Sequence, residues 1–216
     1  MKTKYQAVLF DLDGTLADTA PDLVRAFYRY CDVKQLKQPS YADLQAQVSN
    51  GVVGMLSTLF PDQSREQLEP ARQQIVDYYA ADLASETRLF DGVIELLDAL
   101  EQRSVLWAIV TNKPDFLTQP LLKQLGLSPR AACIVAGDTT AHSKPHPEPL
   151  LHAARELNIS AQTCLYLGDA ERDVQASRAA NMDVLIAGYG YINGHDVAAW
   201  QADGIIKSPQ ELLTWM

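Results

Sequence analysis

Two aspartates stand one residue apart at the end of a short apolar run. The run AVLF spans residues 7–10 and is followed by Asp11, Leu12, Asp13 and Gly14. A strand favours Val, Leu and Phe, and it gains nothing from two like charges at its end. If strand geometry continues as far as Asp13, both carboxylates project in the same direction, and Gly14 then allows a sharp turn. Open α/β sheets place ligands at the carboxyl ends of their strands, so the pair predicts a functional site there.

The elements that must position these carboxylates follow from hydrophobic patterning. Further continuous apolar runs predict strands at 105–111, 132–136, 163–169 and 183–188. Runs without alternation are typical of strands buried on both faces of a parallel sheet. The segments between them predict helices at 92–102, 114–126, 147–158 and 171–181, and several end at residues suited to a left-handed C-terminal cap: Gly126, Asn158 and Asn181. This alternation predicts a Rossmann-like, doubly wound α/β core.

The region between Leu16 and Leu89 breaks this alternation, because it contains helical patterns and no convincing buried strand. One helix is predicted at 21–31, after Asp18 and Thr19 as possible caps. Another is predicted at 64–84, where Ser64 and Gln67 have capping-box spacing and Pro70 predicts a kink or a later start. Outside this region, a second capping box is predicted at Ser208 and Glu211. The simplest interpretation is an all-α helical cap at 17–86 inserted into a core of 1–16 and 87–216.

Composition narrows the classes of function. The chain has 216 residues, 47% of them hydrophobic, and a net charge of -9, which argues against nucleic acid as a partner. The three cysteines are widely spaced and offer no Cys-x-x-Cys pair for zinc, as expected of reduced cysteines in a cytoplasmic protein. The apolar stretch before Asp11 is too short for a signal peptide, and no run is long enough to span a membrane.

Motifs along the chain carry a resemblance to a known family. The string FDLDGTLADT at 10–19 resembles the first motif of the haloacid dehalogenase superfamily, in its phosphatase branch. The later motifs of that family have counterparts in order: Thr111 in AIVTNKP, Lys144 in HSKPHPEP, and Asp169 with Asp173 in YLGDAERD. The resemblance covers essentially the whole chain, including the cap. Ala170 departs from the pattern, because relatives often have Ser or Asp there, and a side-chain hydrogen bond is therefore not expected.

The resemblance implies a magnesium-dependent phosphomonoesterase that acts through an aspartyl-phosphate intermediate. Asp11 is expected to be the nucleophile, and Asp13 to protonate the leaving alcohol and then to activate the hydrolytic water. Mg²⁺ is expected to bind the carboxylates of Asp11 and Asp169 and the backbone carbonyl of Asp13, with Asp173 supporting the site. Cations are needed because a carboxylate about 4 Å from a phosphate dianion is repelled by about 8 kcal/mol at an effective dielectric of about 20.

The remaining motif residues are expected to hold the phosphoryl group. The resemblance assigns phosphoryl oxygens to Thr111 and to the backbone near Asn112, and charge neutralisation to Lys144. The alternatives are a helix cap at Thr111 and a solvated surface cation at Lys113. His142 and His146 are four residues apart, like a helical zinc pair, but the prolines at 145 and 147 prevent a helix there, so metal ligation is not expected.

Substrate choice is expected to lie with the cap. The stretch VSNGVVGML at 48–56 is interpreted either as a turn between cap helices or as a loop over the substrate, with Asn50 and Gly51 as binding candidates. Closure of such a cap would expel water and select small substrates. The chain most resembles phosphoglycolate phosphatases, and its tail resembles N-acetylmuramic acid 6-phosphate phosphatases; a phosphomutase is a further alternative. Both phosphatase substrates carry a carboxylate, which predicts a second anion-binding feature. The expected protein is a monomer or a homodimer.

Overall fold

A computed structural model describes residues 4–192 and 196–216 of the chain. Its core is a six-stranded sheet in which each neighbouring pair of strands is parallel. In spatial order the strands are β5 (Cys133–Val135), β4 (Leu106–Val110), β1 (Ala7–Phe10), β6 (Cys164–Gly168), β7 (Asp183–Ala187) and β8 (Gly204–Ile206). The strand that precedes Asp11 therefore lies inside the sheet, between the strands that precede Thr111 and Asp169. This arrangement confirms the predicted doubly wound parallel core.

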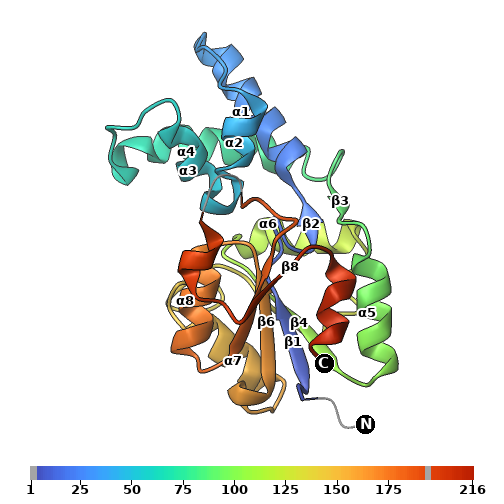
Figure 1. Ribbon diagram of the computed structural model, residues 1–216. Helices are drawn as coiled ribbons and strands as arrows, with labels where there is room; N and C mark the ends of the chain where they lie inside the picture. Colours follow the sequence, from blue (N-terminus) through green and yellow to red (C-terminus); the bar gives the residue numbers. More distant parts are fainter. Residues whose placement is uncertain (1–3, 193–195) are drawn as a thin grey trace.

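Helices cover both faces of the sheet, as Figure 1 shows. They are α5 (Val93–Gln102), α6 (Asp115–Gln124), α7 (Glu148–Glu156) and α8 (Glu171–Ala179). In β1, Val8 and Phe10 pack into the hydrophobic cluster with α5 and α6, whereas Ala7 and Leu9 pack with α7 and α8. Burial of a Val, Leu or Phe side chain stabilises the fold by about 1.5–3 kcal/mol, and continuous apolar runs let each strand use both faces.

A helical layer lies above the carboxyl ends of the strands (Figure 1). It contains α1 (Ala20–Lys34), α2 (Tyr41–Gln45), the 3₁₀ turn η1 (Val48–Asn50), α3 (Gly51–Ser57) and α4 (Arg65–Ala81). Helix α4 packs against α1 and α3. The apolar side chains of this cap join one hydrophobic cluster with the α5 and α6 side of the core.

The cap is connected to the core by a short antiparallel ribbon, β2 (Ala17–Asp18) and β3 (Arg88–Leu89). Asp22 in the first turns of α1 fixes the returning chain: it accepts hydrogen bonds from the backbone N–H groups of Glu86 and Thr87 and from the Thr87 hydroxyl at 2.6 Å. Both chain crossings are thus tied together at one place. The boundaries predicted for the cap, residues 17 and 86, lie beside this ribbon and stay a prediction.

Several local predictions can be compared with the structure. Gly126, Asn158 and Asn181 have the expected positive φ, and Ser64 and Gln67 form a capping box. The later start at Pro70 is wrong, because α4 begins at Arg65.

The last helix and the shortest strands were predicted less well. The predicted capping box at Ser208 is wrong: residues Pro209–Thr214 form the 3₁₀ helix η4, and Glu211 instead accepts a bond from the backbone of Lys207. The strands β2, β3 and β8 were not predicted, since each has only two or three residues and no distinct pattern.

Candidate active site

Asp11 follows β1 directly and is buried in the middle of the site. Its backbone N–H donates to the carbonyl of Leu167 at 2.9 Å, which continues the pairing of β1 with β6 by one residue. Its Oδ1 accepts a hydrogen bond from the backbone of Leu12 at 2.8 Å. The strand ends at Phe10, and Gly14 turns the chain with φ +77°; a Cβ at that position would lie 2.1 Å from Asp169. The predicted sharp turn is confirmed. Glycine is needed there because a side chain would collide with Asp169, which follows β6.

Lys144 is buried and joins three strand ends of the core. Its Nζ lies 3.1 Å from Asp11 Oδ1 and 2.8 Å from Asp173 Oδ1. It also donates to the Val110 carbonyl at 2.9 Å and to the Tyr166 hydroxyl at 2.6 Å. A buried ammonium needs partners of this kind, because desolvation of an unpaired charge costs several kcal/mol. Lys144 is therefore fixed next to Asp11, where the sequence predicted a neutralising cation.

The loop that carries Lys144 is held by Asn112. The Asn112 side chain donates to the carbonyl of Lys144 at 2.8 Å and accepts from its backbone N–H at 3.0 Å. Thr111 is also buried, and its hydroxyl accepts from the backbone of Lys113 at 3.2 Å, which leaves the hydroxyl proton available for another acceptor. The Asn112 side chain thus positions Lys144, while the predicted role of its backbone in phosphoryl binding stays a prediction.

A buried acidic cluster offers the oxygen ligands that Mg²⁺ prefers. Carboxylate oxygens of Asp11, Asp169 and Asp173 lie within 4.8 Å of one another. Asp173 is occupied by Lys144 and by the backbone N–H of Ala170 at 3.0 Å, so it is suited to a supporting role. Asp169 is different, because its Oδ1 is buried and has no hydrogen-bond partner among the described residues. An unsatisfied buried carboxylate oxygen fits a hard cation, and Asp11 with Asp169 would hold it.

Burial and crowding of like charges raise the pKa values of Asp11 and Asp169. Desolvation, together with the neighbouring aspartates, raises the pKa of Asp169 to about 8. Desolvation raises the pKa of Asp11 to about 6, although Lys144 opposes this shift. Burial by itself lowers the pKa of Lys144, but Asp11 and Asp173 outweigh it and the pKa is raised. A bound divalent cation would relieve the repulsion that raises the two aspartate pKa values.

In the described part of the chain, the side chain of Asp13 does not belong to the acidic cluster of Asp11, Asp169 and Asp173. Its Oδ1 is 3.0 Å from Lys113 Nζ and accepts a 2.6 Å hydrogen bond from the Thr19 hydroxyl. Thr19 occupies the N-cap position of α1, as predicted, but its side chain makes no cap hydrogen bond, because its hydroxyl donates to Asp13 instead. Lys113 is buried, with 7% exposure, so the interpretation as a solvated surface cation is wrong.

The cap reaches the acidic cluster through η1. Ser49 donates from its hydroxyl to Asp169 Oδ2 at 2.8 Å. Arg172 in α8 donates to the carbonyl of Ser49 and to Asn50 Oδ1, and the Asn50 amide donates to Gln47. The stretch 48–56 is neither a plain turn nor an open loop, because η1 runs directly into α3 at Gly51. Substrate contacts of Asn50 and Gly51 stay a prediction.

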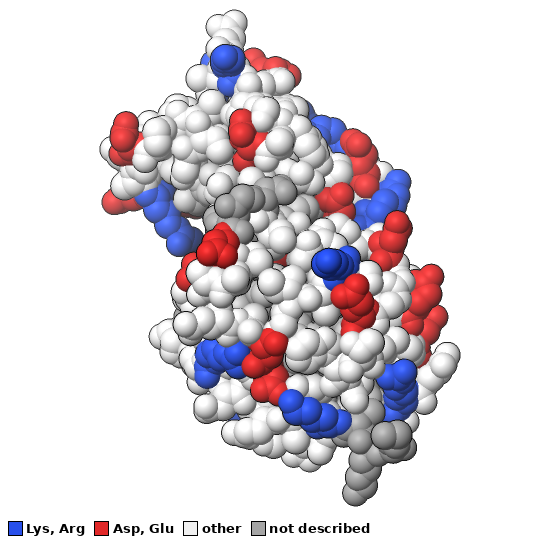
Figure 2. Space-filling model, in the orientation of Figure 1, with Lys and Arg blue, Asp and Glu red and all other residues white. Residues whose placement is uncertain are grey.

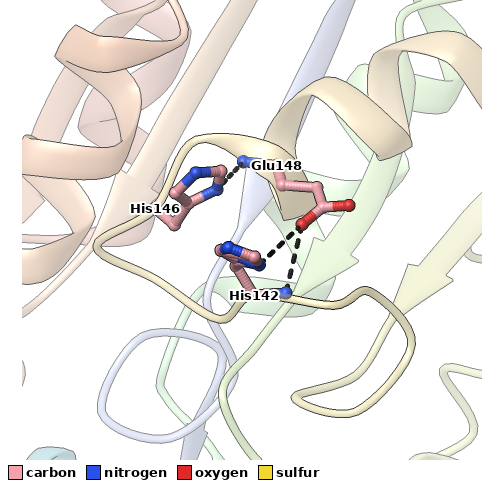
Figure 3. Close-up of side chains that lie close together, drawn as sticks. All are labelled: His142, His146 and Glu148. Carbon is pink, nitrogen blue, oxygen red and sulfur yellow. Dashed lines mark hydrogen bonds and ion pairs between the residues drawn. The ribbon is translucent and has the colours of Figure 1, made fainter.

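His142, His146 and Glu148 meet at the start of α7, as Figure 3 shows. The two imidazole rings are 4.3 Å apart although no helix joins them. The Nδ1 atom of His146 accepts a bond from the backbone of Glu148 at 3.2 Å, and the Glu148 carboxylate accepts from the backbone of His142 at 3.1 Å. These contacts stabilise the loop that holds Lys144. The ligand atoms of His142, His146 and Glu148 lie within 4.8 Å of one another, and the expectation that the two histidines bind no metal stays a prediction.

The sequence reasoning did not predict the contacts of Ser49, Arg172 and Tyr191, and it had considered Lys113 as a possible surface cation. Tyr191 donates its backbone N–H to Asp169 at 3.0 Å, and its hydroxyl contacts Asp18 at 2.6 Å. The only sequence signal was the position of Lys113 and Arg172 inside catalytic motifs. Ser49 and Tyr191 come from segments whose approach to the site depends on tertiary packing.

The surface adds little to the picture of function. On the face in Figure 2, acidic and basic side chains are interspersed, without a continuous basic patch. None of the described helices is both long and apolar enough to cross a membrane. The described cysteines are free thiols: Cys31, Cys133 and Cys164.

This arrangement of strand ends is matched by a known family. The sequence profile of haloacid dehalogenase-like hydrolases matches residues 8–187, and the chain belongs to that family. A phosphoglycolate phosphatase of Xanthomonas campestris pv. campestris is 42% identical over 208 residues, which cover 96% of this chain and 94% of that protein. An N-acetylmuramic acid 6-phosphate phosphatase of Pseudomonas putida is 36% identical over 211 residues, with 97% and 95% covered.

Solved structures show the same fold. A predicted phosphoglycolate phosphatase from Haemophilus somnus superimposes with a TM-score of 0.88 at 26% identity, covering 99% of each chain. A more distant structure, CbbY from Rhodobacter sphaeroides, has a TM-score of 0.77 at 21% identity and supports the fold alone.

Proposed function

We propose that the protein is a magnesium-dependent phosphomonoesterase whose nucleophile is Asp11. The observation that carries the proposal is the contact of Asp11 with Lys144 beside an acidic cluster that includes an unsatisfied carboxylate oxygen of Asp169. Mg²⁺ held by Asp11 and Asp169, and by the backbone carbonyl of Asp13, would supply positive charge that offsets repulsion between Asp11 and a phosphate. The names of the relatives, phosphoglycolate phosphatase among them, support the same reaction class.

In the first step, a carboxylate oxygen of Asp11 attacks phosphorus and the bond from phosphorus to the ester oxygen breaks. Lys144 and the hydroxyl of Thr111 stabilise the charge on the phosphoryl oxygens. The Asp13 carboxyl gives its proton to the departing alkoxide, which leaves as an alcohol. The result is an aspartyl phosphate at Asp11.

In the second step, a water molecule attacks phosphorus of the aspartyl phosphate. Asp13, now ionised, takes the proton of that water. Inorganic phosphate forms, the Asp11 carboxylate is restored, and one water is consumed for each ester hydrolysed. Helices α1 to α4 cover the site during both steps and limit its access to bulk water.

The substrate is proposed to be a small phosphate ester of the 2-phosphoglycolate type. N-acetylmuramic acid 6-phosphate is the second candidate, because relatives that act on each of these compounds are similar to almost the whole chain. Of the basic cap residues, Arg25 and Arg72 are paired with acidic neighbours, Asp22 and Glu69 respectively. The second anion-binding feature predicted from the sequence is therefore not assigned to these two arginines.

Phosphate release from 2-phosphoglycolate and from N-acetylmuramic acid 6-phosphate tests the proposal. Each is measured with Mg²⁺ and with EDTA, for the wild type and for Asp11→Asn. We expect Mg²⁺-dependent release from one of them that falls by more than about 10³-fold in the variant. Equal release with EDTA, or activity that survives Asp11→Asn, would contradict the proposed mechanism. Activity that requires a bisphosphate activator would instead indicate a mutase.

A further inference from the structure

We propose that Lys113 is a positioning residue for Asp13, and that Tyr79 of the cap holds Lys113 in place so that closure of the cap orients the acid. The inference rests on the proposed function, because it concerns the proton donor of that reaction. It deepens that function by assigning a role to a buried lysine that the reaction scheme leaves unused. It also gives the cap a task besides covering the substrate.

The first observation is how Asp13 is held. Its Oδ1 receives two bonds, one from Lys113 Nζ at 3.0 Å and one from the Thr19 hydroxyl at 2.6 Å. Both recorded side-chain bonds to this carboxylate end on the same oxygen. A carboxylate fixed through one oxygen presents the other in a defined direction, which is what transfer of a proton to a leaving group requires.

The second observation is that Lys113 is fixed at its base by the core. Its carbonyl accepts hydrogen bonds from the backbone of Gly137 at 2.8 Å and from the Thr118 hydroxyl at 3.0 Å. Its ammonium group is buried, with only 5% of the side chain exposed. The lysine therefore has a defined origin in the core and a defined target in Asp13.

The third observation comes from the cap. Tyr79 near the end of α4 is 1% exposed, and its ring centroid lies 4.7 Å from Lys113 Nζ. Its hydroxyl has no hydrogen bond of ordinary geometry within the described ranges, 4–192 and 196–216, but it lies close enough to the Lys113 ammonium group to interact with it, and this interaction opposes the effect of burial on the Tyr79 pKa. Tyr79 therefore contacts Lys113 through its ring and its hydroxyl group.

These contacts couple the acid to the cap at both of its ends. Thr19 precedes α1, the first cap helix, and Tyr79 lies in α4, the last. Movement of the cap away from the core would withdraw the aromatic ring and admit water to Lys113. The hydrogen bond from Lys113 to Oδ1 of Asp13 would then be weakened by solvent, and the Asp13 carboxyl would lose its fixed orientation. Proton transfer is thereby linked to the closed, water-poor state.

The test uses two substrates that differ in their need for an acid. The full-length enzyme with Mg²⁺ hydrolyses 2-phosphoglycolate, whose alkoxide must be protonated as it leaves, and 4-nitrophenyl phosphate, whose phenolate leaves without help. We expect Lys113→Met to lower kcat/KM by about 100-fold for the first and less than about threefold for the second. The ratio kcat/KM ends at formation of the aspartyl phosphate, so the later base role of Asp13 does not enter.

Matched variants separate the roles that Lys113 can have. Lys123→Met removes an exposed lysine and is expected to leave both substrates unchanged. Lys113→Arg keeps the charge and is expected to recover part of the lost activity. Equal losses on both substrates would indicate a purely structural or phosphate-binding role and would overturn the proposal. A rise in KM for 2-phosphoglycolate that is absent with ethyl phosphate would indicate binding of the substrate carboxylate and would also overturn it.

Tyr79 provides a second route if Lys113→Met fails to fold. Tyr79→Leu keeps the lysine and is expected to lower kcat/KM by about tenfold for 2-phosphoglycolate but to leave 4-nitrophenyl phosphate nearly unchanged. Equal loss with both substrates would again contradict the proposal. If the wild type hydrolyses neither compound, the proposed function itself fails, and that result is distinguishable from failure of the coupling.

Discussion

Lys144 and Lys113 are both buried beside an aspartate of the first motif, but different parts of the molecule hold them in place. Each contacts Oδ1 of an aspartate in the first motif, and that oxygen has a second donor: the Leu12 N–H at Asp11 and the Thr19 hydroxyl at Asp13. The contacts of Lys144 come from the core strands and the acidic helix that follows β6. Those of Lys113 also include the cap helix α4.

This difference indicates a division of labour within one site. The Asp11 side is built into the sheet, so its geometry is present whatever the cap does. The Asp13 side is completed by residues at both ends of the cap, so its geometry depends on closure. A nucleophile that is always in place, with an acid completed on closure, limits the reaction to substrates that allow the cap to shut.

The largest expected effect distinguishes the two lysines directly. Lys144→Met leaves Asp11 and Asp173 buried without their cation, which we expect to cost about 3–5 kcal/mol of unfolding free energy. We also expect kcat to fall by about 10²–10³-fold for every phosphate ester, because the lost charge faces the phosphoryl group and not the leaving group. Urea unfolding and steady-state kinetics with 2-phosphoglycolate and 4-nitrophenyl phosphate measure the two effects.

The contrast with Lys113 provides the control for that prediction. If the loss in Lys144→Met depended on the leaving group, as is expected only for Lys113→Met, the assignment of Lys144 to the phosphoryl group and of Lys113 to protonation of the leaving group would be contradicted.

The sequence predicted the core side of the site better than its contacts with the cap. The core strands and the polar residues at their ends, Asp11, Thr111 and Asp169, followed from continuous apolar runs, because parallel strands bring those ends to one edge of the sheet. Lys144 lies in a loop after β5 and was expected only from the family resemblance. The contacts of Lys113 with Tyr79 were not readable, since they join segments far apart in sequence through packing of two layers. The short strands at 17–18 and 88–89 have too few residues to show a period.

An intermediate effect concerns Asp169, which the core places beside Asp11 and which the cap contacts through Ser49. Its pKa is raised to about 8 in the protein without metal, so it holds a proton at pH 7, and Mg²⁺ must displace that proton. We expect the apparent Mg²⁺ affinity to rise about tenfold per pH unit up to that pKa and to level off above it. Calorimetric titration with Mg²⁺ from pH 6 to pH 9 at about unit steps measures this dependence.

The sign for stability is opposite. Because the folded protein binds this proton more tightly than the unfolded chain, metal-free stability falls as pH rises from the ordinary range of an aspartate toward the raised pKa of Asp169. In the calorimetric titration, an Mg²⁺ affinity that does not change with pH below the raised pKa of Asp169 would show that Asp169 is ionised before the metal binds.

The smallest effect is expected where the cap touches the core outside the acid. Arg172→Ala removes the contacts to Ser49 and Asn50 at the protein surface, and we expect kcat/KM to change by less than about tenfold. Hydrogen exchange of the backbone at 48–57 should increase, since η1 loses its partner in α8. A loss as large as that of Lys144→Met would mean that Arg172 contacts the substrate. The main contribution of the cap to catalysis would then come from the contacts of Arg172 and not from those of Lys113.

The most direct test of the central claim is to trap the phosphorylated protein. The enzyme with Mg²⁺ is mixed with ³²P-labelled substrate and quenched in acid during turnover. We expect label on the peptide that contains Asp11, released by hydroxylamine as an acyl phosphate is, and no label in Asp11→Asn. Turnover with no protein-bound label, or label that persists at another residue in Asp11→Asn, would contradict Asp11 as the nucleophile.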